Sequence, residues 1–299
     1  MTAPVVMLTG AQGQLGHELI AALAGSCSVK ALDRSQLDLA DASAIVAAVR
    51  TIRPGVIINA AAYTAVDQAE THVADAERIN AVAPRILAEE AKRIGALIVH
   101  YSTDYVFDGT AGTPYTEEAA TNPLSVYGRT KLDGEKAVLA LAPHHLVFRT
   151  SWVYGRRGKN FLLTMQRLAR ERDELRVVAD QRGTPNWSRS LARATADIIG
   201  NGLSLAREKT GLYHLSSRGE ASWFDFARAI VGHSVGKRAV NDAVGESRQP
   251  RVVPITTADY PLPARRPAYA VLDTHRFERS FGFALPDWRS ALKECLDGS

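Results

Sequence analysis

Near its start the chain reads Val5-Val6-Met7-Leu8-Thr9-Gly10-Ala11-Gln12-Gly13-Gln14-Leu15-Gly16. The apolar run predicts a buried strand, and Leu15, Leu19 and Leu23 then recur at helical spacing. The glycines between strand and helix allow a tight turn and let a pyrophosphate approach the N–H groups of the helix. We therefore predict a dinucleotide loop formed by Gly10, Gly13, Gln14, Leu15 and Gly16. A plain strand-to-helix turn is the alternative.

Further apolar runs follow this stretch at 29–32, 56–59, 96–101 and 146–149. Helical patterns separate them, among them an Ala-rich stretch over 83–94 that ends at Gly95. Strands this apolar, joined by helices, favour a parallel sheet covered on both faces. Because crossovers between parallel strands are right-handed, the expected fold class is α/β, a doubly wound Rossmann-like sheet.

The second half of the chain is less regular and richer in arginine, proline and aromatic residues. Residues 160–172 predict a helix, and the proline-rich stretch 250–267 predicts extended or looped chain. We expect a dinucleotide-binding domain over 1–155 and a smaller, mainly substrate-binding part over 156–299. Later segments are free to return and complete the sheet.

The composition is that of a globular protein, with 46% hydrophobic and 23% charged residues in 299. We find neither an apolar run that could cross a bilayer nor a signal peptide. Two cysteines are too few for a disulfide framework, so we expect a cytoplasmic protein. The 36 basic and 32 acidic residues are interspersed, which argues against a nucleic-acid partner and suits an anionic small molecule.

The chain offers two kinds of contact for an adenosine group after the second predicted strand. Asp33 can bind ribose hydroxyls, whereas Arg34 can receive a 2′-phosphate, so NADH and NADPH both remain open. Asp38 and Leu39 suit a contact to adenine. A turn before a helix explains Asp38 equally well.

Tyr127 and Lys131 are four residues apart and would share one helix face. A lysine there would lower the pKa of the tyrosine toward the working pH and make it a general acid. Taken alone, this spacing is more typical of a surface pair. Thr103, however, follows the fourth predicted strand at the carboxyl end of the sheet, where its hydroxyl could orient a substrate carbonyl. Together with the glycine loop, the three residues predict a reductase site.

At this point the chain resembles the extended short-chain dehydrogenase/reductase family. The stretches that carry the resemblance lie at 59–67 (NAAAYTAVD), 100–107 (HYSTDYVF), 127–131 (YGRTK), 149–154 (RTSWVY), 211–215 (GLYHL) and 263–267 (PARRP). The last three are typical of members that reduce a nucleotide-linked 4-keto sugar. The resemblance implies reduction of dTDP-4-dehydro-β-L-rhamnose to dTDP-L-rhamnose with NADPH or NADH, in cell-envelope polysaccharide biosynthesis.

The resemblance also implies roles for single residues. Tyr127 would protonate the alkoxide, Lys131 would hold the nicotinamide ribose, and Thr103 would orient the carbonyl. Gly13, Gln14 and Leu15 would line the pyrophosphate. The nicotinamide half would be flanked by Ala62, Tyr63, Thr64 and Tyr101, and the substrate would be bound by Thr103, Asp104, Trp152 and Arg265.

Some reductases of this family form dimers linked by magnesium ions that acids on two segments ligate. Glu18 matches one of these acids, but the second segment, 184–190, contains no carboxylate. Because magnesium prefers carboxylate oxygens, we expect no metal here. Glu18 is then a solvated acid favoured by the dipole of the first helix. A homodimer without metal stays open.

Two alternatives differ in class from a reductase. A nucleotide-sugar dehydratase or epimerase shares the fold, but Thr103-Asp104-Tyr105 lacks the Asp-Glu pair expected of a dehydratase. A non-catalytic binding subunit of the same family would not need the chemistry. The complete set of Thr103, Tyr127 and Lys131 favours an enzyme.

Overall fold

The computed structural model describes residues 3–238 and 250–298, and its largest element is a parallel sheet. Within those residues the sheet has six strands in the order β10-β5-β4-β3-β1-β2, each parallel to its neighbours. The strands are β1 (Val5–Thr9), β2 (Ser28–Leu32), β3 (Val56–Asn59), β4 (Leu97–Thr103), β5 (His145–Thr150) and β10 (Gly211–His214). All five predicted strands are confirmed, and they form the expected doubly wound sheet.

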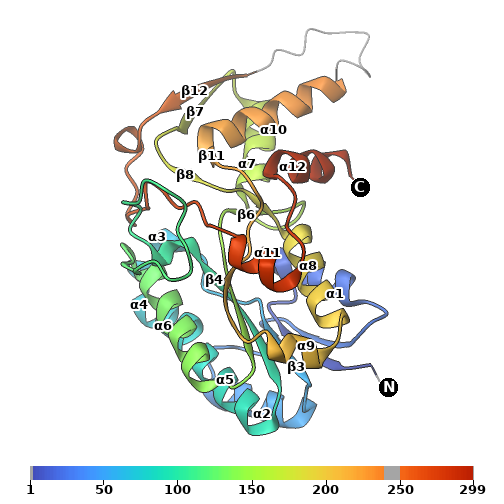
Figure 1. Cartoon of the computed structure of the whole chain (residues 1–299). Helices are drawn as coiled ribbons and strands as arrows, with labels where there is room; N and C mark the ends of the chain where they lie inside the picture. The colour runs from blue at the N-terminus through green and yellow to red at the C-terminus, as the bar shows by residue number, and fades with distance from the viewer. Residues whose placement is uncertain (1–2, 239–249, 299) are drawn as a thin grey trace.

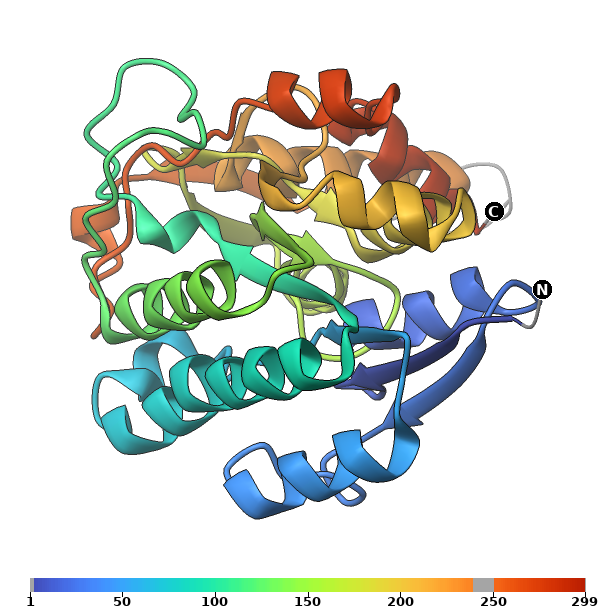
Figure 2. The ribbon, with the colours of Figure 1, turned by 60° about the horizontal axis from the view of Figure 1, so that its bottom comes forward.

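Helices cover both faces of the sheet (Figures 1 and 2). One face carries α2 (Ala42–Ile52), α5 (Ala83–Ile94) and α6 (Val126–Leu141). The other carries α1 (Gln14–Leu23), α8 (Ser188–Gly200), α9 (Leu203–Glu208) and α11 (His275–Phe281). Every residue of β3, β4 and β5 is buried, as strands between two helical layers must be. Gly95 has φ +68° and ends α5 where the sequence predicts.

A second, smaller core lies beyond the carboxyl ends of the strands. It is built from α7 (Phe161–Glu171), α10 (Trp223–Arg238), α12 (Trp288–Asp297) and the parallel pair β7 (Glu174–Val178) and β12 (Arg251–Ile255). Asn160 caps α7 by accepting the N–H of Leu163, which places this helix within the predicted 160–172.

The second half of the chain also returns to the sheet. β10 pairs with β5, and side chains of α8 and α11 share a core with those of α1. The part of the chain after residue 155 therefore builds the second core. It also supplies an edge strand of the sheet and α8, α9 and α11 on one of its faces. The boundary itself stays a prediction.

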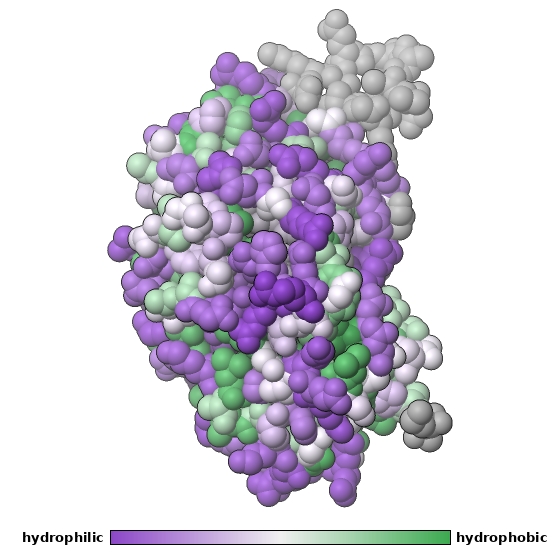
Figure 3. Space-filling view, viewed as in Figure 1, coloured by the Kyte–Doolittle hydropathy of each residue, from purple (hydrophilic) through white to green (hydrophobic). Residues whose placement is uncertain are grey.

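Short elements connect these layers. They are α3 (Val66–Ala69), α4 (Val73–Glu77), the π-helical turn η1 (Arg78–Val82), η2 (Asp104–Val106), β6 (Val153–Tyr154), β8 (Arg182–Gly183), β9 (Asn186–Trp187), β11 (Ala221–Ser222) and η3 (Thr257–Asp259). Among the described residues, no helix combines the length and apolar character that a bilayer span requires. The face shown in Figure 3 is mostly hydrophilic, with apolar residues in small groups.

Candidate active site

The glycine loop between β1 and α1 is built for close approach. Gly10 has φ +76°, and a Cβ there would lie 2.9 Å from the main-chain nitrogen of Ala61. A Cβ on Gly16 would lie 2.1 Å from the carbonyl oxygen of Gly10, so only glycine lets α1 start this close to the loop. Gly13 caps α1 without a side-chain hydrogen bond. The first N–H groups of α1 are thus available to an anion.

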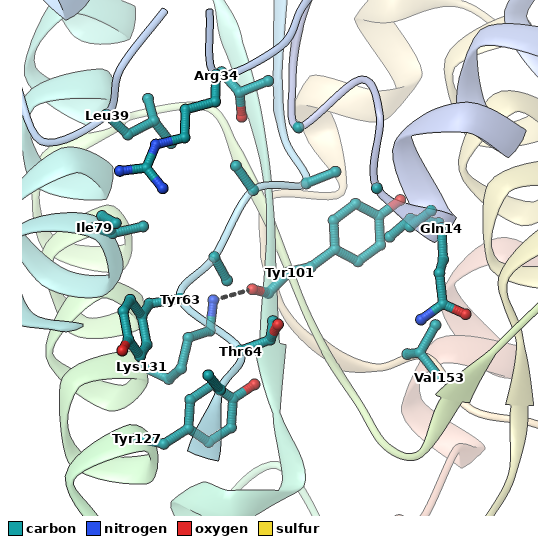
Figure 4. A pocket seen from close by; sticks show the side chains of 18 of the residues that line it. Gln14, Arg34, Leu39, Tyr63, Thr64, Ile79, Tyr101, Tyr127, Lys131 and Val153 are labelled. Atoms are coloured by element: carbon teal, nitrogen blue, oxygen red, sulfur yellow. Dashed lines mark hydrogen bonds between the residues drawn. The ribbon is translucent and has the colours of Figure 1, made fainter. Parts of the chain in front are cut away.

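A cavity of about 560 Å³ opens beside this loop at the carboxyl ends of the strands. Its lining includes most of the residues predicted for the cofactor: Gly10, Gly13, Gln14, Leu15, Asp33, Arg34, Asp38, Leu39, Ala62, Tyr63, Thr64, Tyr101, Tyr127 and Lys131. Gly16 does not line the cavity, because it packs against the main chain of Gly10 on the other side of the loop. Figure 4 shows Arg34 and Leu39 at one end of the cavity, and Tyr127 and Lys131 at the other.

Asp33 is already held by its neighbours at the Arg34 end. Its Oδ1 accepts from the N–H of Ser35 at 2.8 Å, and its Oδ2 accepts from Nε2 of Gln12 at 2.6 Å. The hydrogen bond from the Ser35 hydroxyl, together with these bonds, keeps the pKa of Asp33 below its usual range. Arg34, by contrast, is exposed and extends along the cavity (Figure 4). A fixed carboxylate and an extended guanidinium leave both dinucleotides possible on geometry alone.

Tyr127 and Lys131 share one face of α6, which is the arrangement that their spacing predicts, with Lys131 buried and Tyr127 half-buried. Ser125 caps this helix by accepting the N–H of Gly128. Burial raises the pKa of Tyr127 to about 12 and lowers the pKa of Lys131 to about 8. The ammonium group of Lys131 donates to the main-chain oxygen of Tyr101 at 2.6 Å (Figure 4).

One expectation about this pair is wrong. The sequence predicts that Lys131 brings the pKa of Tyr127 down toward neutral pH, but burial outweighs any such effect and the phenol keeps its proton. A tyrosine that keeps its proton until the substrate oxygen beside it becomes basic is suited to act as the general acid.

Thr103 and Asp104 lie behind the cavity wall. The hydroxyl of Thr103 donates to Oδ1 of Asp104 at 3.0 Å and also faces the phenol of Tyr127. Asp104 is 2% exposed, and burial raises its pKa to about 7. Among the residues that the structure describes, its Oδ2 has no hydrogen-bond partner. Ser102 and Tyr101 of β4 line the cavity, whereas Thr103 does not.

Trp152 directly follows β5 and the buried Ser151, in a conformation that is rare for a large residue, with φ +43°. Its indole stacks on that of Trp223. On Gly183, a Cβ would lie 2.7 Å from the same indole, so that position must be free of a side chain. The ring is therefore held in place by residues from β8 and α10. Its predicted contact with a sugar stays a prediction.

The two arginines of the Pro-flanked segment 263–267 differ in their exposure to solvent and in their partners. Arg265, the predicted substrate contact, is exposed to solvent. Arg266 is mostly covered and forms an ion pair with Asp67 of α3 at 2.8 Å. Of the two, Arg266 is the one that the fold fixes in place.

Sequence reasoning missed several residues of the cavity wall: Thr9, Leu37, Ala60, Ala61, Ala65, Gln68, Ile79, Ser102, Thr150 and Val153. Ala60 and Ala61 directly follow β3, so the strand-end position that pointed to Ala62 could have found them. Gln68 and Ile79 come from α3 and η1, whose placement over the cavity has no local signal in the sequence.

The expectation for Glu18 needs a correction. Its side chain is 12% exposed and accepts from Nε of Arg189 on α8 at 2.9 Å. It is therefore an ion-paired residue between two packed helices and not a solvated acid. The described residues contain no group of three or more His, Cys, Asp or Glu side chains arranged to hold a metal ion.

The fold and this cavity together define a dinucleotide-binding oxidoreductase of the extended short-chain dehydrogenase/reductase class. Within that class the chain belongs to the family described as the RmlD substrate binding domain, whose model matches residues 4–299.

Relatives within this family are similar over nearly their whole length. A dTDP-4-dehydrorhamnose reductase of Burkholderia thailandensis is 46% identical over 297 residues, which covers 97% of each chain. A probable dTDP-4,6-dihydroxy-2-methyloxan-3-one 4-ketoreductase of Streptomyces antibioticus is 44% identical and covers 97% of this chain and 94% of its own. The crystal structure of dTDP-4-dehydrorhamnose reductase from Bacillus anthracis, in complex with NADP, superposes with a TM-score of 0.90 at 35% identity and full coverage of both chains.

Proposed function

We propose that this protein is an NAD(P)H-dependent reductase that converts dTDP-4-dehydro-β-L-rhamnose to dTDP-L-rhamnose. The observation that carries the proposal is the placement of Tyr127 and Lys131 at one end of a dinucleotide-sized cavity. The chain as a whole is 46% identical over 297 residues to a reductase named for this substrate.

The cavity suits a nicotinamide dinucleotide, which supplies a hydride when bound. The volume lies in the range of cofactor sites. Gly10 and Gly13 provide a wall without side chains, and the first turn of α1 offers N–H groups to a pyrophosphate. Ser102 Oγ and Thr150 Oγ1, both on cavity-lining residues, have no partner within the described residues.

The protein groups at the Tyr127 end manage the proton and the orientation of the substrate. As the 4-keto oxygen gains negative charge, Tyr127 donates its phenolic proton to it, and the resulting phenolate is stabilised by the ammonium group of Lys131. Thr103, which faces Tyr127, orients the carbonyl. Lys131, whose ammonium group donates to the Tyr101 carbonyl, would also hold the nicotinamide ribose. The tyrosine must then regain a proton from solvent.

We assign the nucleotide-sugar contacts to Trp152 and Arg265, with the buried Asp104 acting through the hydroxyl of Thr103, which donates to it. We assign the pyrophosphate contacts to Gly13, Gln14 and Leu15. The free thiols of Cys27 and Cys295 fit a reducing, cytoplasmic location. We retain the division at residue 155 between the dinucleotide-binding domain and the mainly substrate-binding part. Self-association without a metal is compatible with these assignments.

A direct assay tests the reaction. Purified protein is mixed with dTDP-4-dehydro-β-L-rhamnose and either NADPH or NADH, and the absorbance of the reduced nicotinamide is followed while the sugar product is identified by mass. We expect oxidation of the cofactor and gain of two hydrogens by the sugar. Absence of turnover with both cofactors would refute the proposal.

The similarity to a 4-ketoreductase that acts on another sugar favours testing a second substrate. A dTDP-linked 4-keto sugar that lacks one ring hydroxyl serves this purpose. We expect a lower kcat/KM with it, because a site built to pair a hydroxyl leaves polar groups unpaired when that hydroxyl is missing.

A further inference from the structure

Asp67 and Arg266 join the two halves of the molecule beside the cavity. Arg266 Nη1 donates to Oδ1 of Asp67 at 3.1 Å and Nη2 donates to Oδ2 at 2.8 Å, in a two-pronged pair. The N–H of Ala264 adds a third bond to the same carboxylate at 3.2 Å. Asp67 belongs to α3, and the next residue of that helix, Gln68, lines the cavity. In Figure 1 the chain between η3 and α11 passes beside α3.

A second contact holds the same segment. Gly109 has φ +80°, and a Cβ there would lie 2.5 Å from the main-chain nitrogen of Ala268 and 2.6 Å from Cα of Pro267. The loop that follows η2 thus packs directly against the segment 264–268. The segment is fixed from two sides, so the guanidinium of Arg266 has a defined place.

That place is beside Tyr105. The cation of Arg266 opposes the rise in the pKa of Tyr105 that burial causes, as expected of a charge close to the phenol. The Tyr105 ring meets the ring of Tyr127 edge-on, with centroids 5.4 Å apart and planes at 80°. This is a favourable geometry for two aromatic rings.

Tyr105 has little freedom to move away from Tyr127. A Cβ on Gly128 would lie 2.3 Å from the carbonyl oxygen of Tyr105, so the backbones of η2 and α6 touch directly. The main chain of Tyr105 therefore lies against Gly128, its ring meets Tyr127, and the charge of Arg266 lies close to its phenol.

From this series of contacts we infer that Arg266 is a positioning residue for the proton donor. Bound to Asp67, it braces Tyr105, and Tyr105 keeps the ring of Tyr127 at the angle from which it reaches the substrate oxygen. The inference rests on the proposed role of Tyr127 as proton donor. Because a misplacement of about 1 Å can cost on the order of 100-fold in rate, a brace of this kind affects turnover more than binding.

Steady-state kinetics of Arg266→Ala test the inference. We expect kcat to fall 10- to 100-fold while KM for the nucleotide sugar changes less than threefold, because Tyr127 loses its brace and the binding surface remains. The solvent isotope effect on kcat should increase, since proton transfer becomes slower. Arg266→Lys should recover only part of kcat, because an ammonium group cannot form the two-pronged pair.

Arg218→Ala is the matched control. Arg218 makes a comparable two-pronged pair with Glu278 at 3.2 and 2.8 Å, away from the dinucleotide cavity. We expect its kcat to equal that of the wild type. If Arg266→Ala matches this control, or raises KM alone, the inference is wrong. A lower fraction of active sites with an unchanged kcat per site would show a role in folding only, and would equally overturn it.

A double-mutant cycle separates this inference from the proposed function. If the effect of Arg266 passes through Tyr105, the loss in kcat of Arg266→Ala and Tyr105→Leu combined should be no larger than that of either alone. Additive losses would contradict the inference. An inactive wild type would instead refute the proposed function, so the two failures give different results.

Discussion

The indole rings of Trp152 and Trp223 stack face to face, with centroids 3.6 Å apart and planes 10° apart. The two residues belong to different parts of the fold, since Trp152 follows β5 and Trp223 begins α10. Phe161 packs on Trp223 in turn, with centroids 4.7 Å apart. Trp152, despite its positive φ, is therefore anchored through the aromatic core of the second half.

Loss of this support should weaken the use of the sugar. For Trp223→Ala we expect kcat/KM for the nucleotide sugar to fall about 10-fold, with an unchanged Kd for the dinucleotide, because Trp152 loses the ring that orients it. Trp223→Phe keeps a stacking partner and should stay within about threefold of wild type. Steady-state kinetics and near-UV circular dichroism measure both effects. An unaltered kcat/KM in Trp223→Ala would show that the stack does not serve the substrate.

Lys131 should set the alkaline limit of activity. Burial lowers its pKa to about 8, so the side chain is charged below that pH and neutral above it. We expect kcat to fall as the pH rises through about 8, since the neutral amine no longer stabilises phenolate. Lys131→Arg remains charged and should be slower but without that limb. The test is a pH profile of kcat for the wild type and for Lys131→Arg. If kcat of the arginine variant also fell near pH 8, that fall would belong to a group other than Lys131.

Arg34 should govern the preference between the two dinucleotides. Its exposed guanidinium lies at the far end of the cavity from Tyr127 (Figure 4), where it can meet a 2′-phosphate. Arg34→Ala should raise KM for NADPH roughly 10- to 100-fold and change KM for NADH less than threefold. Equal changes for both cofactors would place Arg34 outside phosphate recognition.

Asp104 should make the fold less stable as the pH rises. Its pKa is about 7 in the folded chain against an ordinary value of 3.8, so unfolding releases a proton between these values. The free energy of unfolding should therefore fall between about pH 4 and 7, by at most on the order of 4 kcal/mol, and level off above pH 7. Asp104→Asn should remove this slope in denaturant titrations at several pH values.

Asp108→Asn provides the opposite case. Hydrogen bonds from Thr110 and others lower the pKa of Asp108 to about 2, so its contribution is present at neutral pH and lost as the pH falls through that value. This variant should be less stable than wild type above pH 4, and the difference should narrow in acid. If stability changed with pH in the same direction in both variants, burial of Asp104 would not be the cause of the fall in stability between pH 4 and 7.

Magnesium should have no role in the assembly or activity of this chain. The Arg189 guanidinium already pairs with Glu18 at 2.9 Å, so a cation there would have to displace it. A chelator such as EDTA, and magnesium added back, should leave kcat and the sedimentation coefficient unchanged. A chelator-induced change in the sedimentation coefficient would reveal a metal-linked dimer.

The parts that could be predicted are those with a local signal. The glycine loop, the apolar strands and the spacing of Tyr127 and Lys131 each depend on a few neighbouring residues. The structure confirms the sheet and brings the loop and the pair to one cavity. The partners of Trp152 and Asp67 could not be predicted, because Trp223 and Arg266 reach them only through tertiary packing. The prediction for the pKa of Tyr127 was wrong for a similar reason, since sequence spacing reports the nearby lysine but not the depth of burial.

The position of β10 at the edge of the sheet affects how the chain is made. β10 pairs with β5, yet α7, α8 and several short strands are synthesised between them. Until His214 has left the ribosome, the nascent chain carries β5 as an open edge with unpaired backbone groups, which invites association with other chains. The first half expressed alone, ending at residue 155, would therefore leave that edge uncovered.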